Sequence, residues 1–134
     1  MSDDYSVELK LDGDPAMLSV AARLFREMGE VPDGPGGDEI ERLAAAVEPV
    51  LAALLESLSQ LPGPPSLDLK LGYAAREVTV ELSVASAGRK GRKLLGKDAG
   101  SLVAGVEKIF DKVVGPKAPA GSAFQLNLTR TIPA

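Results

Sequence analysis

The segment from residue 91 to residue 98 has the residue types and spacing of a phosphate-binding loop. Gly91 and Gly96 are separated by four residues, Lys97 follows, and the segment lies between an expected strand and an expected helix. In such a loop the backbone N–H groups and the lysine hold phosphates, and a Ser or Thr hydroxyl after the lysine ligates magnesium. Asp98 stands at that position, and its carboxylate would repel phosphate. The expected strand order is also not that of a parallel sheet, so the sequence argues against a working loop of this kind.

The same region carries a dense cluster of positive charge. A cluster of this kind suits phosphates, nucleic acid or an acidic protein surface. Aromatic residues make up only 4% of the chain and none is interleaved here, which disfavours stacking on single-stranded nucleic acid. A solvated loop is the plainest interpretation, a protein-binding loop the second and nucleic acid the third. The basic cluster consists of Arg89, Lys90, Arg92, Lys93 and Lys97.

Other chemistry is limited by what the sequence lacks. There is no cysteine and no histidine, which removes disulfides, thiolate nucleophiles, the usual zinc sites and Ser-His-Asp arrangements. Four acidic residues lie on the second expected helix, at Glu39, Glu41, Glu48 and Glu56. Glu41 and Glu48 share a face and could form a carboxylate pair, but with Arg42 beside them and an apolar stripe opposite they fit a solvated face better. The composition therefore removes the easy routes to catalysis without excluding an enzyme.

Length and charge are consistent with one domain over residues 1–134 of the chain. Hydrophobic residues make up 45% of the 134 residues, and the formal net charge is -4. Residues 1–62 carry 13 acidic and four basic side chains, whereas residues 63–134 carry six acidic and 11 basic ones. This polarity suits recognition of a partner or head-to-tail self-association. The acidic N-terminus and the absence of a long apolar stretch predict a cytoplasmic protein.

Hydrophobic periodicity predicts the elements that would position these residues. Alternation predicts strands over 7–11, 67–71, 78–84 and 124–129, with a hairpin turn at 72–76. Helical spacing predicts helices over 17–28, 38–61 with a kink or break at Pro49, and 98–113 ended by Gly115-Pro116. A short extra strand around Val113-Val114 is an alternative. We expect an α+β two-layer sandwich, in which three helices cover one face of a mostly antiparallel sheet of four to five strands, in the order β-α-α-β-β-α-β.

Four short motifs occur along this order of elements: Arg42–Ala53 in the second expected helix, Val84–Gly88 at a strand end, Gly100–Leu102 in the third expected helix and Gly121–Phe124 before the last strand. The order and these motifs resemble the anti-sigma-factor serine kinases, small bacterial members of the histidine-kinase and gyrase type ATPase superfamily. Arg42–Ala53 resembles the helix that carries the Glu and Asn of that family, and Val84–Gly88 the strand end with its Asp-x-Gly. Gly100–Leu102 is similar to its Gly-x-Gly-Leu, and Gly121–Phe124 to the Gly-Thr pair before its last strand. The resemblance covers nearly the whole chain.

The chain departs from the family where that family does its chemistry. By the resemblance, Ala53 replaces the magnesium-binding Asn, Pro49 the catalytic Glu, Ser86 the adenine-reading Asp and Leu102 a motif glycine. Alanine gives magnesium no oxygen and proline cannot polarise a hydroxyl. The positions of the degenerate pocket are Pro49, Ala53, Ser86, Gly88, Gly100 and Leu102.

Because these functional residues are absent, we expect no enzyme activity, no metal and no cofactor. The resemblance therefore implies a pseudokinase that binds a protein, either a sigma factor or the antagonist that releases one. It also implies a homodimer, because family members pair through the first strand and first helix. Two other hypotheses stay open at this point. One is a weak purine-nucleotide sensor that uses Ser86, Gly88 and the basic cluster, and the other is a structural module that assembles through its acidic and basic halves.

Overall fold

The computed structural model describes residues 5–11, 16, 18–30, 36–60, 66–84, 104–117 and 124–132. Its elements are β1 (Tyr5–Leu11), α1 (Leu18–Gly29), α2 (Gly37–Ser59), β2 (Leu67–Ala74), β3 (Glu77–Val84), β4 (Lys112–Lys117) and β5 (Phe124–Thr131). The strands form one sheet in the order β1-β2-β3-β5-β4, and every neighbouring pair is antiparallel. The predicted α+β class with a mostly antiparallel sheet is confirmed, with five strands.

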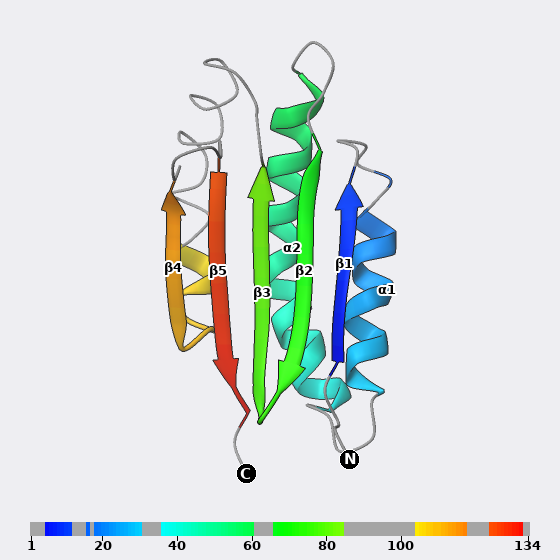
Figure 1. The fold of residues 1–134 in the computed structure, drawn as a ribbon, viewed down its shortest axis with the longest axis vertical. Coiled ribbons are helices and arrows are strands. Elements are labelled where there is room, and N and C mark those ends of the chain that lie inside the picture. The colour runs from blue at the N-terminus through cyan, green and yellow to red at the C-terminus, as the bar shows by residue number, and fades with distance from the viewer. Residues whose placement is uncertain are drawn as a thin grey trace.

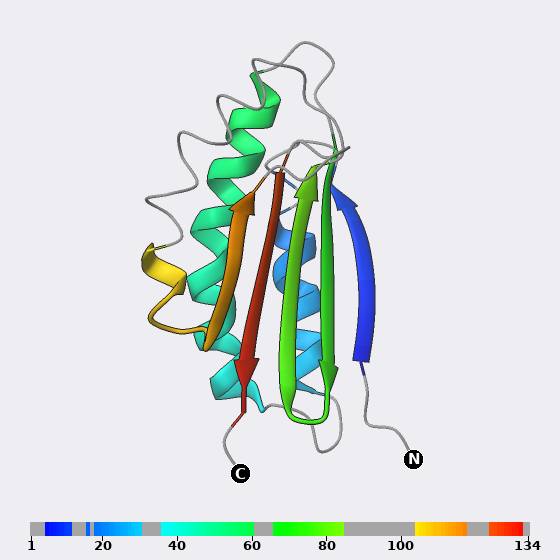
Figure 2. The same ribbon diagram turned by 60° about the vertical axis from the view of Figure 1, so that its left-hand side comes forward.

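The alternation of apolar and polar residues gives this sheet two different faces. The register places Leu9, Leu69, Leu82 and Leu126 in one row across four strands, and α1 and α2 lie against the face that carries this row (Figure 1). We call it the covered face. Turning the molecule shows that these helices and the segment 104–106 all lie on that one side of the sheet (Figure 2). The opposite face, which carries the polar residues, is called the open face.

Two residues make the turn between β2 and β3. Ala75 and Arg76 have φ angles of 51° and 66°, so both are left-handed, as the mirror-image turns of two-residue hairpins require. Such turns favour Asn and Gly, because a Cβ atom is strained in this conformation. The predicted turn over 72–76 was therefore too long at its start, since β2 continues to Ala74.

The second helix continues through its proline. Ile40, Leu43, Val47, Leu51 and other apolar residues of α2 are buried, whereas Pro49 and Ala45 are exposed. Proline at position 49 cannot donate a hydrogen bond to the carbonyl of residue 45, four positions earlier, and this loss falls on the solvent side of the helix. Of the two predicted alternatives at Pro49, a kink or a break, the break is wrong, because α2 is continuous from Gly37 to Ser59.

The third helix ends earlier than its apolar spacing predicted. Within the described part, residues 104–106 are helical, and the N–H groups of Ile109 and Phe110 both donate to the carbonyl of Val106, at 3.0 and 2.9 Å. The chain then turns, and β4 begins at Lys112. The prediction that the helix reaches Val113 was wrong, and the alternative of a short strand there is confirmed.

Gly115 and Pro116 lie inside β4 and do not end a helix. The pairing of β4 with β5 shifts between Val114 and Lys117, which is a β-bulge, and Gly115 has a φ of 105° there. A bulge on an edge strand tolerates both a left-handed glycine and a residue that has no N–H.

Among the described residues, no helix has the length and apolar character needed to cross a membrane.

Candidate functional site

Pro49 and Ala53 are the two positions of the degenerate pocket that the structure describes, and both lie on α2. Glu39, Ala46 and Ala53 are spaced by seven residues and lie on one side of the helix. The Glu39 carboxylate contacts Arg130 of β5, so this side of α2 is directed toward β5. Ala53 is half-buried, and Pro49, one turn earlier, is exposed. The two residues therefore lie one turn apart on α2, Pro49 toward the solvent and Ala53 partly covered.

The side chains at these two positions are hydrocarbon. Neither a methyl group nor a pyrrolidine ring can ligate a cation or accept a proton. On the side of α2 that meets α1, Glu48 lies at the rim of a crevice of only about 10 Å³ with Ala22 and Leu51. Neither this crevice nor the larger cleft described below includes Pro49 or Ala53.

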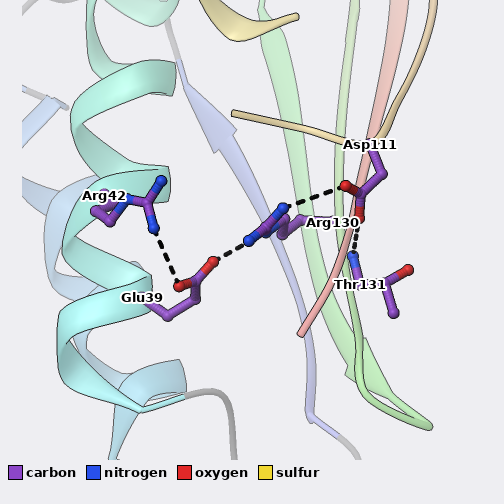
Figure 3. A network of polar contacts seen from close by, with 5 residues as sticks. All are labelled: Glu39, Arg42, Asp111, Arg130 and Thr131. Atoms are coloured by element: carbon purple, nitrogen blue, oxygen red, sulfur yellow. Dashed lines mark hydrogen bonds and ion pairs between the residues drawn. The ribbon is translucent and has the colours of Figure 1, made fainter. Parts of the chain in front are cut away.

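A polar network begins on the same side of α2, near the start of the helix (Figure 3). Arg130 lies on the covered face of β5, where its Nε donates to Oε1 of Glu39 at 2.9 Å and its Nη1 to Oδ1 of Asp111 at 3.2 Å. Arg42, which is 60% exposed, approaches the other Glu39 oxygen at 3.6 Å. The network joins α2, β5 and the turn before β4.

Hydrogen bonding fixes the charges in this network. The backbone N–H of Thr131 donates to Asp111 at 2.6 Å, and this bond, with Arg130 nearby, lowers the pKa of Asp111 below its ordinary value of 3.8. The hydrogen bond to Glu39 is the main cause that raises the pKa of Arg130. Asp111 and Arg130 are therefore both ionised near neutral pH.

Sequence analysis missed Arg130. The alternation in the sequence could have identified it. Leu126, Leu128 and Arg130 are two residues apart on one strand, so they lie on the same face. A cation on a face covered by helices needs an acidic partner. The partner, Glu39, is 91 residues away, so sequence spacing could not identify it.

The open face of the sheet has a cleft of about 430 Å³ over β1, β2 and β3. Lys70 lies in it, with its Nζ 3.2 Å from Oε1 of Glu8. The hydrogen bond to Glu8, together with the charges of Glu8 and Glu81, raises the pKa of Lys70 above 10.5. Gln125 donates to Glu81 at 3.2 Å. The polar residues that line the cleft are Glu8, Lys10, Asp68, Lys70, Glu81 and Ser83.

One polar atom beside this cleft is unsatisfied. The Asn127 Oδ1 atom is shielded from solvent and has no hydrogen-bond partner. Asn127 pairs with Glu81 of β3 and with Val114 of β4, so it lies on the open face. A buried acceptor without a donor is costly, which makes this position a weak point of the sheet.

The other candidate positions divide between exposed residues and residues outside the described part. Glu41, Glu48 and Glu56 are exposed, which agrees with a solvated helix face. No group of three or more acidic, histidine or cysteine side chains that could hold a metal ion occurs among the described residues. The positions outside the described residues are Ser86, Gly88, Arg89, Lys90, Arg92, Lys93, Lys97, Gly100 and Leu102.

Comparison with known proteins gives no match: no protein-family model fits the chain, and no curated protein matches it significantly.

Proposed function

We propose that this chain is a non-catalytic regulatory domain that binds another protein. In this proposal it is a pseudokinase of the anti-sigma-factor type, which keeps the shape of a small ATPase domain and lacks its site. An antiparallel sheet with helices on one face, and two helices between the first and second strands, supports that relationship. The finer parts of the proposal are a cytoplasmic location and a homodimeric state.

The observation that carries the proposal is the chemistry of α2 at the two positions where the resemblance implies the site. A kinase of this type would need a magnesium ligand and a catalytic carboxylate there, and the chain has the methyl group of Ala53 and the exposed ring of Pro49. The Glu39 carboxylate, on the side of α2 that is directed toward β5, is already held by Arg130 and Arg42. With the oxygen ligands replaced or engaged, binding of a protein is the part of the family's function that can remain.

The partner we propose is a sigma factor or the antagonist protein that releases one. The basic cluster is the best candidate for the contact, because five cations within nine residues attract an acidic surface over a distance of about 10 Å at ordinary salt.

Capture from an extract of the native host tests this proposal. We expect the wild-type protein to retain a sigma factor or its antagonist, identified by mass spectrometry. A variant with glutamine at the five positions of the basic cluster should retain at least about tenfold less, since charge complementarity steers association.

A matched control removes five exposed cations elsewhere, so that the net charge changes equally. Its capture should equal that of the wild-type protein. Equal loss in both variants would mean that only net charge matters, and recovery of nucleic acid alone would contradict protein binding. The control substitutes Arg23, Arg26, Arg76, Lys108 and Lys112.

A further inference from the structure

Two neighbouring rows of the open face carry opposite charges on β1 and on β2. The register places Glu8, Lys70 and Glu81 side by side on β1, β2 and β3. The next row along the same strands is Lys10, Asp68 and Ser83. Members of the two rows are two residues apart on each strand, or about 7 Å. On β1 the two rows therefore carry Glu8 and Lys10, and on β2 they carry Lys70 and Asp68, so each strand has one positive and one negative charge.

The two rows differ in whether their charged side chains form an ion pair within the chain. Glu8 and Lys70 form an ion pair. Lys10 and Asp68 are direct cross-strand partners in the register, yet the ion pairs made by the described residues do not join them. Lys10 is exposed and Asp68 half-buried, so both remain available to another molecule.

The charge of the cleft also differs from that of the whole protein. The chain has a net charge of -4, so two copies repel each other on average. The cleft lining has two lysines and three carboxylates, close to balance. A second copy can therefore approach this face with less repulsion than the average surface would impose.

We propose that a second copy of this chain packs on the open face, sheet against sheet. The two-fold axis lies between the sheets, perpendicular to the strands, midway between the two charged rows. This rotation places each row opposite the other row of the second copy. Glu8 then faces Lys10 of the partner subunit, and Lys70 faces Asp68 of the partner subunit, each pair occurring twice.

The geometry is that of an isologous interface between aligned sheets. The same patch is used on both copies, as a closed two-fold requires. Packed sheets cross at about 30° because each is twisted, so the pairs nearest the point where the two sheets cross align best. Long side chains of each copy can enter the cleft of the other. Exposed ion pairs are individually weak and screened by salt, so the dimer should depend strongly on ionic strength.

This interface is independent of the partner binding in the proposed function. It uses the face opposite α2, and it leaves the β5-facing side of α2 and the helix α1 uncovered. A protein that binds a sigma factor could lack this dimer, and a protein with this dimer could lack that partner. It also differs from the dimer through the first strand and first helix that the resemblance implies.

Sedimentation velocity of two charge-reversal variants tests the interface. In a homodimer of Lys10→Glu, two carboxylates face each other at each β1 contact, and in a homodimer of Glu8→Lys, two ammonium groups do. We therefore expect each variant alone to be monomeric. An equimolar mixture restores both pairs and should sediment as a heterodimer. For the wild-type protein, the dissociation constant should rise by about tenfold or more between about 0.02 and 0.5 M salt.

Two further variants make the result specific. The double variant Glu8→Lys with Lys10→Glu exchanges the charges within one chain, so it should dimerise again. Arg23→Glu and Glu27→Lys reverse two exposed charges on α1 and should leave the dimer unchanged. Circular dichroism verifies that every variant is folded, which is expected because these positions are exposed.

Three results would overturn the proposal. The first is a wild-type protein that stays monomeric at both salt concentrations. The second is dimerisation of either single variant of β1 at wild-type strength, or a mixture that fails to associate. The third is a dimer that is lost in the α1 variants and kept in the β1 variants, because the contact would then lie on the other side of the molecule.

Discussion

The two faces of the sheet differ in what their residues are free to do. Along β2, Leu67, Leu69 and Leu71 are buried under the helices, whereas Asp68 is half-buried and Lys70 exposed on the open face. Every second residue of β2 therefore packs into the core, and the residues between them contact the solvent or another molecule. The covered face determines the fold, and the open face can vary its charges without changing that fold.

A similar contrast holds between the centre of the covered face and its margin at the end of β5. Its centre is hydrocarbon, but near the end of β5 it carries Arg130, which the carboxylates of Glu39 and Asp111 hold in place. A charge is tolerated there because it is paired at the margin of the core, where its side chain keeps 20% of its exposure.

The largest effect should come from a core leucine. Leu71→Ala, at a position with no exposed surface, should lower the free energy of unfolding by about 3 kcal/mol, because it removes buried methyl groups and leaves a cavity. Lys70→Ala, at the neighbouring position on the open face, is the matched control and should leave this free energy nearly unchanged, because Lys70 is exposed. Urea denaturation in high salt measures both. Equal effects would contradict the distinction between the faces.

The next largest effect should come from the charged end of the covered face. Arg130→Met should cost about 2 kcal/mol of unfolding free energy, since it leaves two carboxylates without their common partner. Arg42→Met removes a cation that meets the same Glu39 from a 60% exposed position, and it should cost under about 0.5 kcal/mol. A cost as small for Arg130 as for Arg42 would show that the network does not stabilise the fold.

A smaller effect of opposite sign is expected at the hairpin that joins β2 and β3. Replacing Ala75 by Asn and Arg76 by Gly should raise the unfolding free energy by about 1 kcal/mol, because both residues have positive φ angles that strain a side chain. Neither face changes in this variant. Loss of stability would mean that these side chains make contacts that outweigh the strain.

The smallest effects should appear in the pH dependence of the free energy of unfolding, where Asp111 and Lys70 act at opposite ends of the pH range. The pKa of Asp111 is lowered in the folded protein, so its contribution is present above the ordinary value of 3.8 and is lost as pH falls through the folded value. The pKa of Lys70 is raised, so its contribution is present below 10.5 and is lost as pH rises through the folded value.

Single variants assign each limb of that profile. Asp111→Asn should flatten the acid limb alone, and Lys70→Gln should flatten the alkaline limb alone. Thermal unfolding across the pH range gives the measurement. If Asp111→Asn left the acid limb as steep as before, the hydrogen bond from Thr131 would not hold that carboxylate in its charged form.

Elements with local, periodic patterns could be predicted from the sequence, and those decided by distant contacts could not. Alternation in β2 and β3 and helical spacing in α1 gave the right elements, because their buried faces repeat within a few residues. The stretch from Val106 to Val113 has the spacing of a helix, yet β4 begins at Lys112 because it can pair with β5. That pairing, like the bond from Thr131 to Asp111, joins residues far apart in the chain.

The candidate site divides in the same way. The placement of Pro49 and Ala53 one turn apart follows from the helix period, as does the contact of Glu39 with Arg42. The contact of Glu39 with Arg130 depends on how α2 packs on β5. The paired rows of the open face depend on strand register, which the sequence specifies only together with the fold.

Calorimetric titration with ATP and magnesium is the most direct test of the loss of the nucleotide site. Because Ala53 and Pro49 offer neither a metal ligand nor a base, we predict no magnesium-dependent binding heat at ATP concentrations up to about 1 mM, the range of a dissociation free energy of about 4 kcal/mol. Saturable binding at micromolar ATP that requires magnesium would contradict this account.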